Sequence, residues 1–340
     1  MAHRSALLTV TCAEQSAASD LASQVMRPSA RVFLMPALPR RAAATMLVVA
    51  GAVTGAHFSV GSGASRAGAA ATPERIAVPL ATGYGAEGSG GIVLIDPSGR
   101  RVATLTRPRP GREDSQPAWS PDGKWLAFTR TTDGRRSFQI YVMRANGSGV
   151  RRITRGRFDY DPAWSPDGTW IAYQANGVLR IVHPDGTRGR VIPTRSPTDV
   201  GWPAWAPEGR IAYSYWAVTP YDWPPACRQP GSGCGNVISS PLDGSQRRRV
   251  VQGRDAHWSP DGRTIVYTGP DGGVYTAPGQ GGAGRALGRG YHAEWSRNGE
   301  QIVYARMGDT PAQDSVWIMN GDGTHAHRVL RGGSNPSWQP

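Results

Sequence analysis

The stretch Pro117-Ala-Trp-Ser-Pro-Asp-Gly123 is followed directly by Lys-Trp-Leu-Ala-Phe-Thr, and this combination decides the fold. In the Ser-Pro-Asp-Gly segment, proline presets the backbone φ angle, aspartate hydrogen-bonds to the local backbone and glycine tolerates a positive φ, so a tight turn is expected. The run after the turn is alternating and rich in aromatic residues, which predicts a returning strand over residues 125–129. The stretch therefore indicates two antiparallel strands joined by a hairpin turn.

The same stretch occurs six times along the chain, fully at residues 162–168 and more loosely at the other positions. Each copy carries one anchor tryptophan, and the six are Trp119, Trp164, Trp205, Trp258, Trp295 and Trp338. Their successive separations are 45, 41, 53, 37 and 43 residues, which lie in the range that is typical of propeller blades.

A third strand follows each returning strand, and most copies then turn through Asn-Gly or Asp-Gly into a fourth strand that contains arginine. Before Trp119 the chain offers three strands, over residues 75–81, 91–96 and 102–106, and at its other end Trp338 offers only a first strand. One blade is thus shared between both ends, which closes the ring and leaves no open edge. We predict an all-β fold, a six-bladed β-propeller of four-stranded antiparallel blades over residues 73–340, in which the C-terminal strand completes the first blade.

These repeats resemble the WD40-like repeats of the TolB-type propeller family and of the propellers attached to prolyl-oligopeptidase-type peptidases. The resemblance covers roughly residues 75–340 and rests on the repeated Pro-Ala-Trp-Ser-Pro-Asp-Gly motif. It implies the propeller fold and an envelope protein that binds other proteins. TolB also carries an N-terminal α/β domain, and the 72 residues before Pro73 are too few and wrongly patterned to supply one.

The first 72 residues have the pattern of an export segment and not of a folded domain. No charged residue occurs over residues 42–65, this stretch has an apolar centre, and Arg40 and Arg41 stand directly before it. The small residues that follow favour cleavage near Ala69. The alternative is that the segment stays uncleaved and anchors the protein, in which case it alone would contact a membrane. We expect residues 1–72 to lie outside the fold and the protein to be secreted, periplasmic or associated with the cell envelope.

A long insertion between residues 216 and 236 distinguishes one blade from the others. It contains Cys227 and Cys234, which we expect to form a disulfide in an exported protein, the alternative being two free thiols. It also contains Tyr221 and Trp223, whose rigid rings would anchor a protein or carbohydrate partner unless they pack locally on the blade.

A ring of candidate binding residues stands three positions before the anchor tryptophans. Five of its six members are polar, and the set is Gln116, Asp161, Trp202, Asp255, His292 and Asn335. At the start of the innermost strands these side chains would surround one mouth of the central channel and hold a cation, a peptide terminus or a sugar. The alternative is that they only cap and solvate the strands.

Two neighbouring blades add a further polar residue directly before the anchor, His257 in one and Glu294 in the other. Convergence of these two with Asp255 and His292 would suit a transition metal. Some propellers that resemble this one perform metal-assisted sugar elimination with histidines, so a channel-mouth lyase is the alternative function.

Composition and motifs narrow the function further. The net charge of +13 comes from 38 basic residues, of which only Lys124 is lysine, and these are dispersed along the chain without the clustered footprint of a nucleic-acid site. No Gly-x-Ser-x-Gly elbow, phosphate loop or dinucleotide fingerprint is present. We therefore predict a monomeric binding or scaffolding module, not an enzyme, with a protein or peptide partner or a carbohydrate ligand, no catalytic residue, no cofactor and no resident metal.

Overall fold

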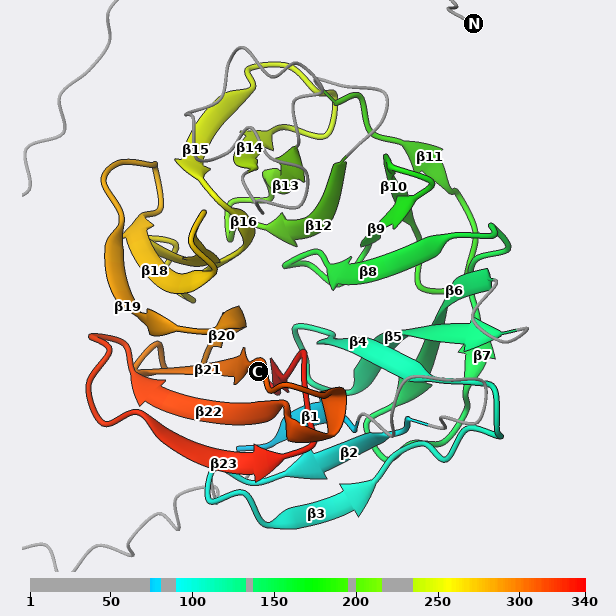
Figure 1. The fold of residues 1–340 in the computed structure, drawn as a ribbon. Coiled ribbons are helices and arrows are strands. Elements are labelled where there is room, and N and C mark those ends of the chain that lie inside the picture. The colour runs from blue at the N-terminus through cyan, green and yellow to red at the C-terminus, as the bar shows by residue number, and fades with distance from the viewer. Residues whose placement is uncertain (1–73, 81–89, 133–136, 195–199, 216–234) are drawn as a thin grey trace, which may run out of the picture. The chain divides into compact units, whose positions relative to one another are not determined.

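Six sheets of four antiparallel strands surround a common centre in the computed structural model of the chain (Figure 1). The structure describes residues 74–80, 90–132, 137–194, 200–215 and 235–340. The predicted six-bladed propeller is confirmed. The export segment, the insertion with Tyr221 and Trp223, and the pair Cys227 and Cys234 lie outside the described residues, so these stay predictions, as does the domain boundary at residue 72.

The strands follow chain order from the inside of each blade to its outside, except in blade one. Blade one consists of β24 (Ser337–Trp338), β1 (Ile76–Pro79), β2 (Ile92–Ile95) and β3 (Arg101–Thr104). Blade two consists of β4 (Asp114–Trp119), β5 (Trp125–Thr132), β6 (Ser137–Arg144) and β7 (Arg151–Arg152). Blade three consists of β8 (Asp159–Trp164), β9 (Ile171–Ala175), β10 (Val178–Val182) and β11 (Arg190–Val191).

The remaining three blades have the same order. Blade four consists of β12 (Val200–Trp205), β13 (Ile211–Tyr215), β14 (Asn236–Ser240) and β15 (Arg248–Gln252). Blade five consists of β16 (Arg254–Trp258), β17 (Thr264–Thr268), β18 (Gly273–Pro278) and β19 (Arg285–Arg289). Blade six consists of β20 (Tyr291–Trp295), β21 (Gln301–Arg306), β22 (Ser315–Asn320) and β23 (His327–Arg331), with the 3-10 turn η3 (Pro311–Gln313) before β22. Among the described residues, no helix has the length and apolar character needed to cross a membrane.

The ring closes through blade one, as the sequence predicted. Trp338 and Ser337 of β24 pair with Ile76 and Ala77 of β1, and the backbone N–H of the next residue donates to the carbonyl of Arg75 at 2.8 Å. The inner edge of blade one is therefore covered by a strand from the far end of the chain.

The hydrophobic core is divided into six clusters, one between each pair of neighbouring blades. In the cluster that joins blades one and six, Ile76 and Val78 pack with Val316 and Ile318, and all four are buried. Because neighbouring blades pack face to face, a central strand such as β2, with the sequence Ile-Val-Leu-Ile, is apolar and buried along its whole length. The blades are therefore held together mainly by apolar packing.

The Ser-Pro-Asp-Gly turn forms as its chemistry predicts. The hydroxyl of Ser120 donates to Asp122 Oδ1 at 2.6 Å and accepts from the backbone N–H of Trp125 at 2.9 Å, while Gly123 has a φ of +66°. The same serine contacts recur in blades three and five, and in blade six with Asn298 in place of the aspartate. The turn aspartates are thus engaged in turn structure.

The anchor tryptophans join some blades but not others. The indole N–H of Trp119, Trp164 and Trp205 each donates to a backbone carbonyl of the preceding blade, at 3.3, 3.1 and 3.1 Å. Trp258 donates to Gly279 within its own blade, and the buried indole N–H groups of Trp295 and Trp338 have no acceptor among the described residues. These bonds therefore link blades one to four in series and are absent around blades five and six.

This difference predicts a stability contrast between two similarly buried tryptophans. Trp119 and Trp295 are 6% and 9% exposed, so replacement of either by phenylalanine removes similar packing. Trp119→Phe also removes an inter-blade hydrogen bond, whereas Trp295→Phe removes a buried donor without an acceptor. We expect Trp119→Phe to cost about 1 kcal/mol more in unfolding free energy.

Urea unfolding followed by far-ultraviolet circular dichroism measures both variants against the parent chain. A loss from Trp295→Phe that equals or exceeds the loss from Trp119→Phe would contradict the assigned inter-blade bond.

Candidate functional site at the channel mouth

One residue near the start of each blade's inner strand has an unusual backbone conformation. The six residues that stand three positions before the anchor tryptophans have φ angles between +42° and +56°, and none is glycine. In blades two to six the pairing of the first two strands shifts register across this residue. Such a bulge re-aims one side chain, and the left-handed backbone costs about 1–2 kcal/mol for each non-glycine residue.

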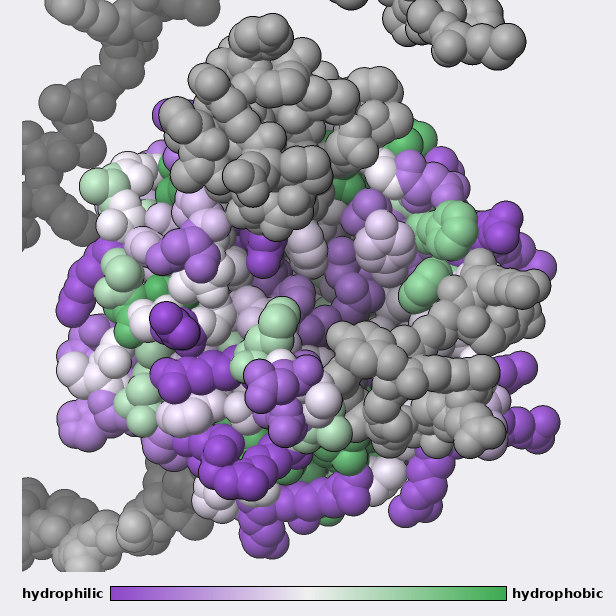
Figure 2. Space-filling model, viewed as in Figure 1, coloured by the Kyte–Doolittle hydropathy of each residue, from purple (hydrophilic) through white to green (hydrophobic). Residues whose placement is uncertain are grey.

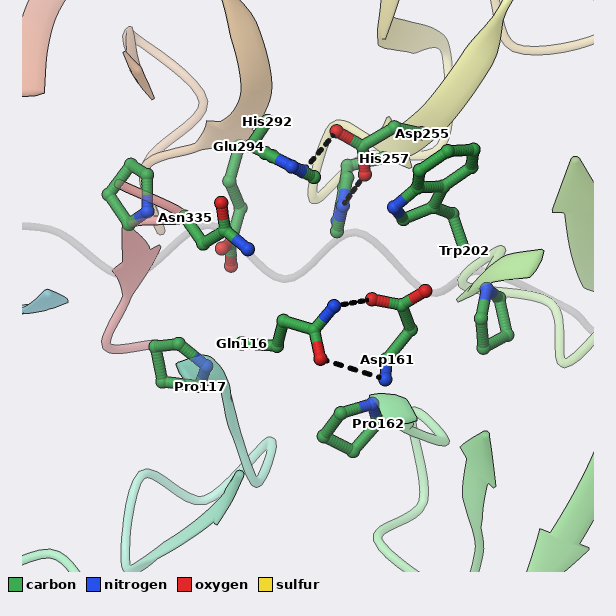
Figure 3. A pocket seen from close by; sticks show the side chains of 12 residues that line it. Gln116, Pro117, Asp161, Pro162, Trp202, Asp255, His257, His292, Glu294 and Asn335 are labelled. Carbon is green, nitrogen blue, oxygen red and sulfur yellow. Dashed lines mark hydrogen bonds and ion pairs between the residues drawn. The ribbon is translucent and has the colours of Figure 1, made fainter. Parts of the chain in front are cut away.

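The bulges direct these side chains to the centre of the ring, where they surround one pocket (Figure 3). All eight residues that the sequence marked line it, namely Gln116, Asp161, Trp202, Asp255, His257, His292, Glu294 and Asn335. The space-filling view shows the surface hollowed and hydrophilic near this centre (Figure 2). The pocket has a volume of only about 70 Å³, room for a few water-sized groups, so a larger ligand must extend outside it.

Asp255 is the centre of the charged cluster in this pocket. Nδ1 of His292 lies 2.7 Å from its Oδ2, Nε2 of His257 lies 3.5 Å from its Oδ1, and its backbone N–H donates to the hydroxyl of Ser214 at 3.0 Å. Burial raises the pKa of Asp255, but the charge of His292 and the contacts of both imidazoles outweigh burial and hold this pKa well below its usual range.

The two imidazoles respond in the opposite direction. Burial lowers the pKa of His257 and of His292, but the neighbouring Asp255 more than offsets burial and raises both pKa values above their ordinary range. His257 keeps about a third of its side chain exposed (36%) and His292 keeps 23%, so both rings remain accessible from the channel. The cluster is therefore one carboxylate held between two imidazole rings.

Two further carboxyl groups in the pocket titrate near neutrality. Burial raises the pKa of Asp161 to about 7, against the opposing charge of His292. Burial likewise raises the pKa of Glu294 to about 7, although His257 and a hydrogen bond with Ser337 oppose this. The charge of the pocket therefore changes around neutral pH.

Hydrogen bonds link some members of the ring and leave others open. The side-chain amide of Gln116 donates to Asp161 Oδ1, and its oxygen accepts from the backbone N–H of Asp161 at 3.3 Å. The ring of Trp202 lies 6.5 Å from the imidazole of His292, measured between centroids. Among the described residues the side-chain amide of Asn335 has no hydrogen-bond partner, so it is available to a ligand.

A second cavity of about 400 Å³ shares Pro117, Pro162, His257 and Glu294 with the mouth pocket. All six anchor tryptophans line it. His257 and Glu294 therefore stand between a polar compartment at the mouth and an aromatic compartment deeper in the channel.

The arrangement does not fit the transition-metal centre considered from the sequence. Within the part of the chain that the structure describes, no group of three or more His, Cys, Asp or Glu side chains has an arrangement that could hold a metal ion. The imidazole nitrogens nearest to Asp255, Nε2 of His257 and Nδ1 of His292, instead each face one of its carboxylate oxygens.

Sequence reasoning missed residues that support or extend the mouth. Ser214, which holds the backbone of Asp255, lies on β13 of the preceding blade, and no spacing in the sequence relates it to the anchor tryptophan. Arg254 and Tyr291 directly precede two of the marked residues, so their position in the repeat could have identified them.

Comparison with known proteins gives a family and several similar folds. The family described as TolB beta propeller domain matches residues 46–217. No curated protein matches the chain.

Three solved structures illustrate the likeness of fold. TolB from Acinetobacter baumannii has a TM-score of 0.59 at 20% identity, over 78% of this chain and 67% of that one. Hydrazine synthase from Kuenenia stuttgartiensis has a TM-score of 0.60 at 14% identity, over 79% and 47%. A chain of a nidogen/laminin complex has a TM-score of 0.58 at 12% identity, over 78% and 98%. At these identities the likeness concerns the fold alone.

The raised pKa of Asp161 predicts that stability falls as the pH rises through the acid and neutral range. The folded protein keeps up to about pH 7 a proton that the unfolded chain releases near pH 4, so unfolding becomes easier between these values. Asp161→Asn removes this contribution. Between about pH 5 and pH 8 we expect the unfolding free energy of the parent chain to fall by about 2 kcal/mol more than that of the variant.

Urea unfolding monitored by tryptophan fluorescence at the two pH values measures the difference. Asp243→Asn is the control, because the turn contacts of Asp243 lower its pKa and it is ionised throughout this range in both states. An equal pH dependence in Asp161→Asn and the parent chain would refute the raised pKa. His257 and His292 contribute in the same direction, since their stabilisation is lost as the pH rises through their raised pKa values.

Proposed function

The chain belongs to the TolB beta propeller domain family, and on that premise we propose that it is an exported module whose channel mouth binds a peptide segment of a partner protein at the cell envelope. The single observation that carries this proposal is the set of six left-handed, non-glycine residues around the mouth. Backbone strain of this kind persists where the surrounding structure enforces it, and it is concentrated at sites of binding and catalysis.

The chemistry of the mouth supports recognition of polar groups. Asn335 offers an open amide, the imidazoles of His257 and His292 offer donors, and the carboxyl groups of Asp161 and Glu294 offer acceptors, or donors when protonated. A peptide terminus or a short polar side chain fits a space of about 70 Å³, while the rest of the peptide lies on the surface around it.

The described lining of the mouth contains no serine or cysteine that could act as a nucleophile. The lining contains one tight acid–base group, in which the imidazoles of two histidines face the carboxylate of Asp255. The proposal therefore assigns binding to these residues and no catalytic step.

Location and organisation are part of the same proposal. The charge-free segment over residues 42–65 supports export, and proteins of the TolB family supply the expectation of a periplasmic or envelope position. We place the binding function in a monomeric propeller over residues 73–340, with residues 1–72 as the export segment or anchor and a disulfide between Cys227 and Cys234.

The proposal is tested with peptides selected from a random displayed library on the full chain. A selected peptide is then labelled, and its affinity is measured by fluorescence anisotropy. Asn335→Ala removes the open amide of the mouth, and we expect it to weaken binding about tenfold.

Gln246→Ala is a matched control. Gln246 is also an amide residue with a positive φ, of 41°, but it is exposed in the outer hairpin between β14 and β15 of blade four. Its replacement should leave the affinity within about twofold of the parent value. Peptides that bind the parent chain, Asn335→Ala and Gln246→Ala equally would overturn the channel mouth as the binding site.

A further inference from the structure

A groove extends from the channel mouth outward over blade five. It has a volume of about 1100 Å³ and shares Trp202, Asp255 and His292 with the mouth pocket. Its outer part is formed by the turn before β18, by β18 itself and by β19, which are the gold and orange strands in Figure 1. The mouth pocket is therefore the inner end of a much longer depression.

The groove is lined by three arginines, at positions 254, 289 and 306. The side chain of Arg289 is exposed, and among the described residues its guanidinium has no hydrogen-bond or ion-pair partner. Arg306 is held in place, since it donates to the carbonyl of Arg289 at 3.1 Å and its guanidinium carbon lies 3.8 Å from the ring centroid of Trp317. Arg254 lies over Trp202, 5.7 Å from the ring centroid.

The lining of the groove also contains two carboxylates. Asp255 is already paired with two histidines at the inner end. The other lining carboxylate is Asp271, whose oxygens accept from the hydroxyl of Tyr275 at 3.0 Å and from the backbone N–H of Gly273 at 3.0 Å. The three arginines of the lining therefore outnumber Asp271, its one carboxylate outside the histidine pairs.

The rest of the lining suits an extended chain. Trp202, Tyr275 and Tyr291 present aromatic rings, and four glycines, at positions 272, 273, 288 and 290, add no side chain to the groove. Rigid aromatic groups lose little conformational entropy on binding, and glycine allows a close approach to the backbone.

We infer that this groove binds an extended acidic peptide segment, with a peptide terminus or a short polar side chain in the channel mouth. Guanidinium groups pair bidentately with carboxylates, so the arginines of the groove carry the acidic specificity. An acidic polysaccharide shares the charge, but the small mouth pocket admits a short polar group and not a sugar ring. The inference rests on the proposed function, because it specifies the peptide that the mouth receives.

The test uses labelled peptides of about eight residues, composed of glutamate, glutamine or lysine, and fluorescence anisotropy on the full chain. The glutamate peptide should bind, and the other two should not. Because the contacts are between partly exposed charges, its affinity should fall about tenfold between about 50 mM and about 300 mM NaCl. Equal binding of the glutamine peptide would overturn the acidic specificity.

The decisive comparison is between two variants that remove the same charge. Arg254→Gln with Arg289→Gln removes two arginines from the groove, and we expect about tenfold weaker binding. Arg151→Gln with Arg152→Gln removes two exposed arginines from β7, which lies on the opposite side of the ring, and should change the affinity less than about twofold (Figure 1). Equal losses in both variants would show binding to net charge alone and overturn the groove.

Three further measurements keep the outcomes separate. Arg289→Gln alone alters an exposed side chain, so a loss of binding there with an unchanged melting temperature supports the groove independently of folding. Oligogalacturonate that competes more strongly than the glutamate peptide would make the occupant a glycan and overturn the peptide. If Asn335→Ala binds the glutamate peptide normally while Arg254→Gln with Arg289→Gln does not, the groove stands and the proposed role of the mouth fails.

Discussion

A single backbone constraint, repeated in every blade, organises the centre of this molecule. One residue is held in the left-handed region three positions before the anchor tryptophan. In five blades the pairing of the two innermost strands shifts register across this residue. Because side chains alternate along a strand, this shift decides both which side chain enters the channel and which face the tryptophan occupies. The polar mouth and the packing of neighbouring blades thus have one origin.

The six blades share this constraint but are chemically unequal. Where the residue before the anchor tryptophan is Ala118 or Ala163, its carbonyl accepts an indole N–H from the next blade. The corresponding positions in blades five and six carry His257 and Glu294, and the indole bonds across these positions are missing. The charged cluster and the arginine-lined groove therefore belong to the part of the ring in which the described residues make no indole bond between blades.

Local chemistry made most of the fold predictable. Ser-Pro-Asp-Gly specifies its turn by itself, and the spacing of the anchor tryptophans gives the number of blades, so the ring and its closure through β24 followed from the sequence. The eight residues of the mouth were predictable because they hold a fixed position in a repeat.

Other features depend on contacts between distant parts of the chain. The pairing of two histidines with Asp255 depends on the directions of side chains from two blades, and the groove combines Trp202 of blade four with β18 and β19 of blade five. Neither relation has a constant spacing in the sequence. The positive φ of Trp202 could not be foreseen either, since a bulky aromatic residue rarely adopts this conformation.

The closure of blade one through β24 also bears on the order of events when the chain is made. Blades two to six can pair their strands as soon as each has left the ribosome, whereas β1 stays without its inner neighbour until Ser337 and Trp338 have been synthesised. The contact between the two ends has a large loop-closure cost and so forms late. An open arc with one incomplete sheet is therefore the state of the chain until its last strand has been synthesised.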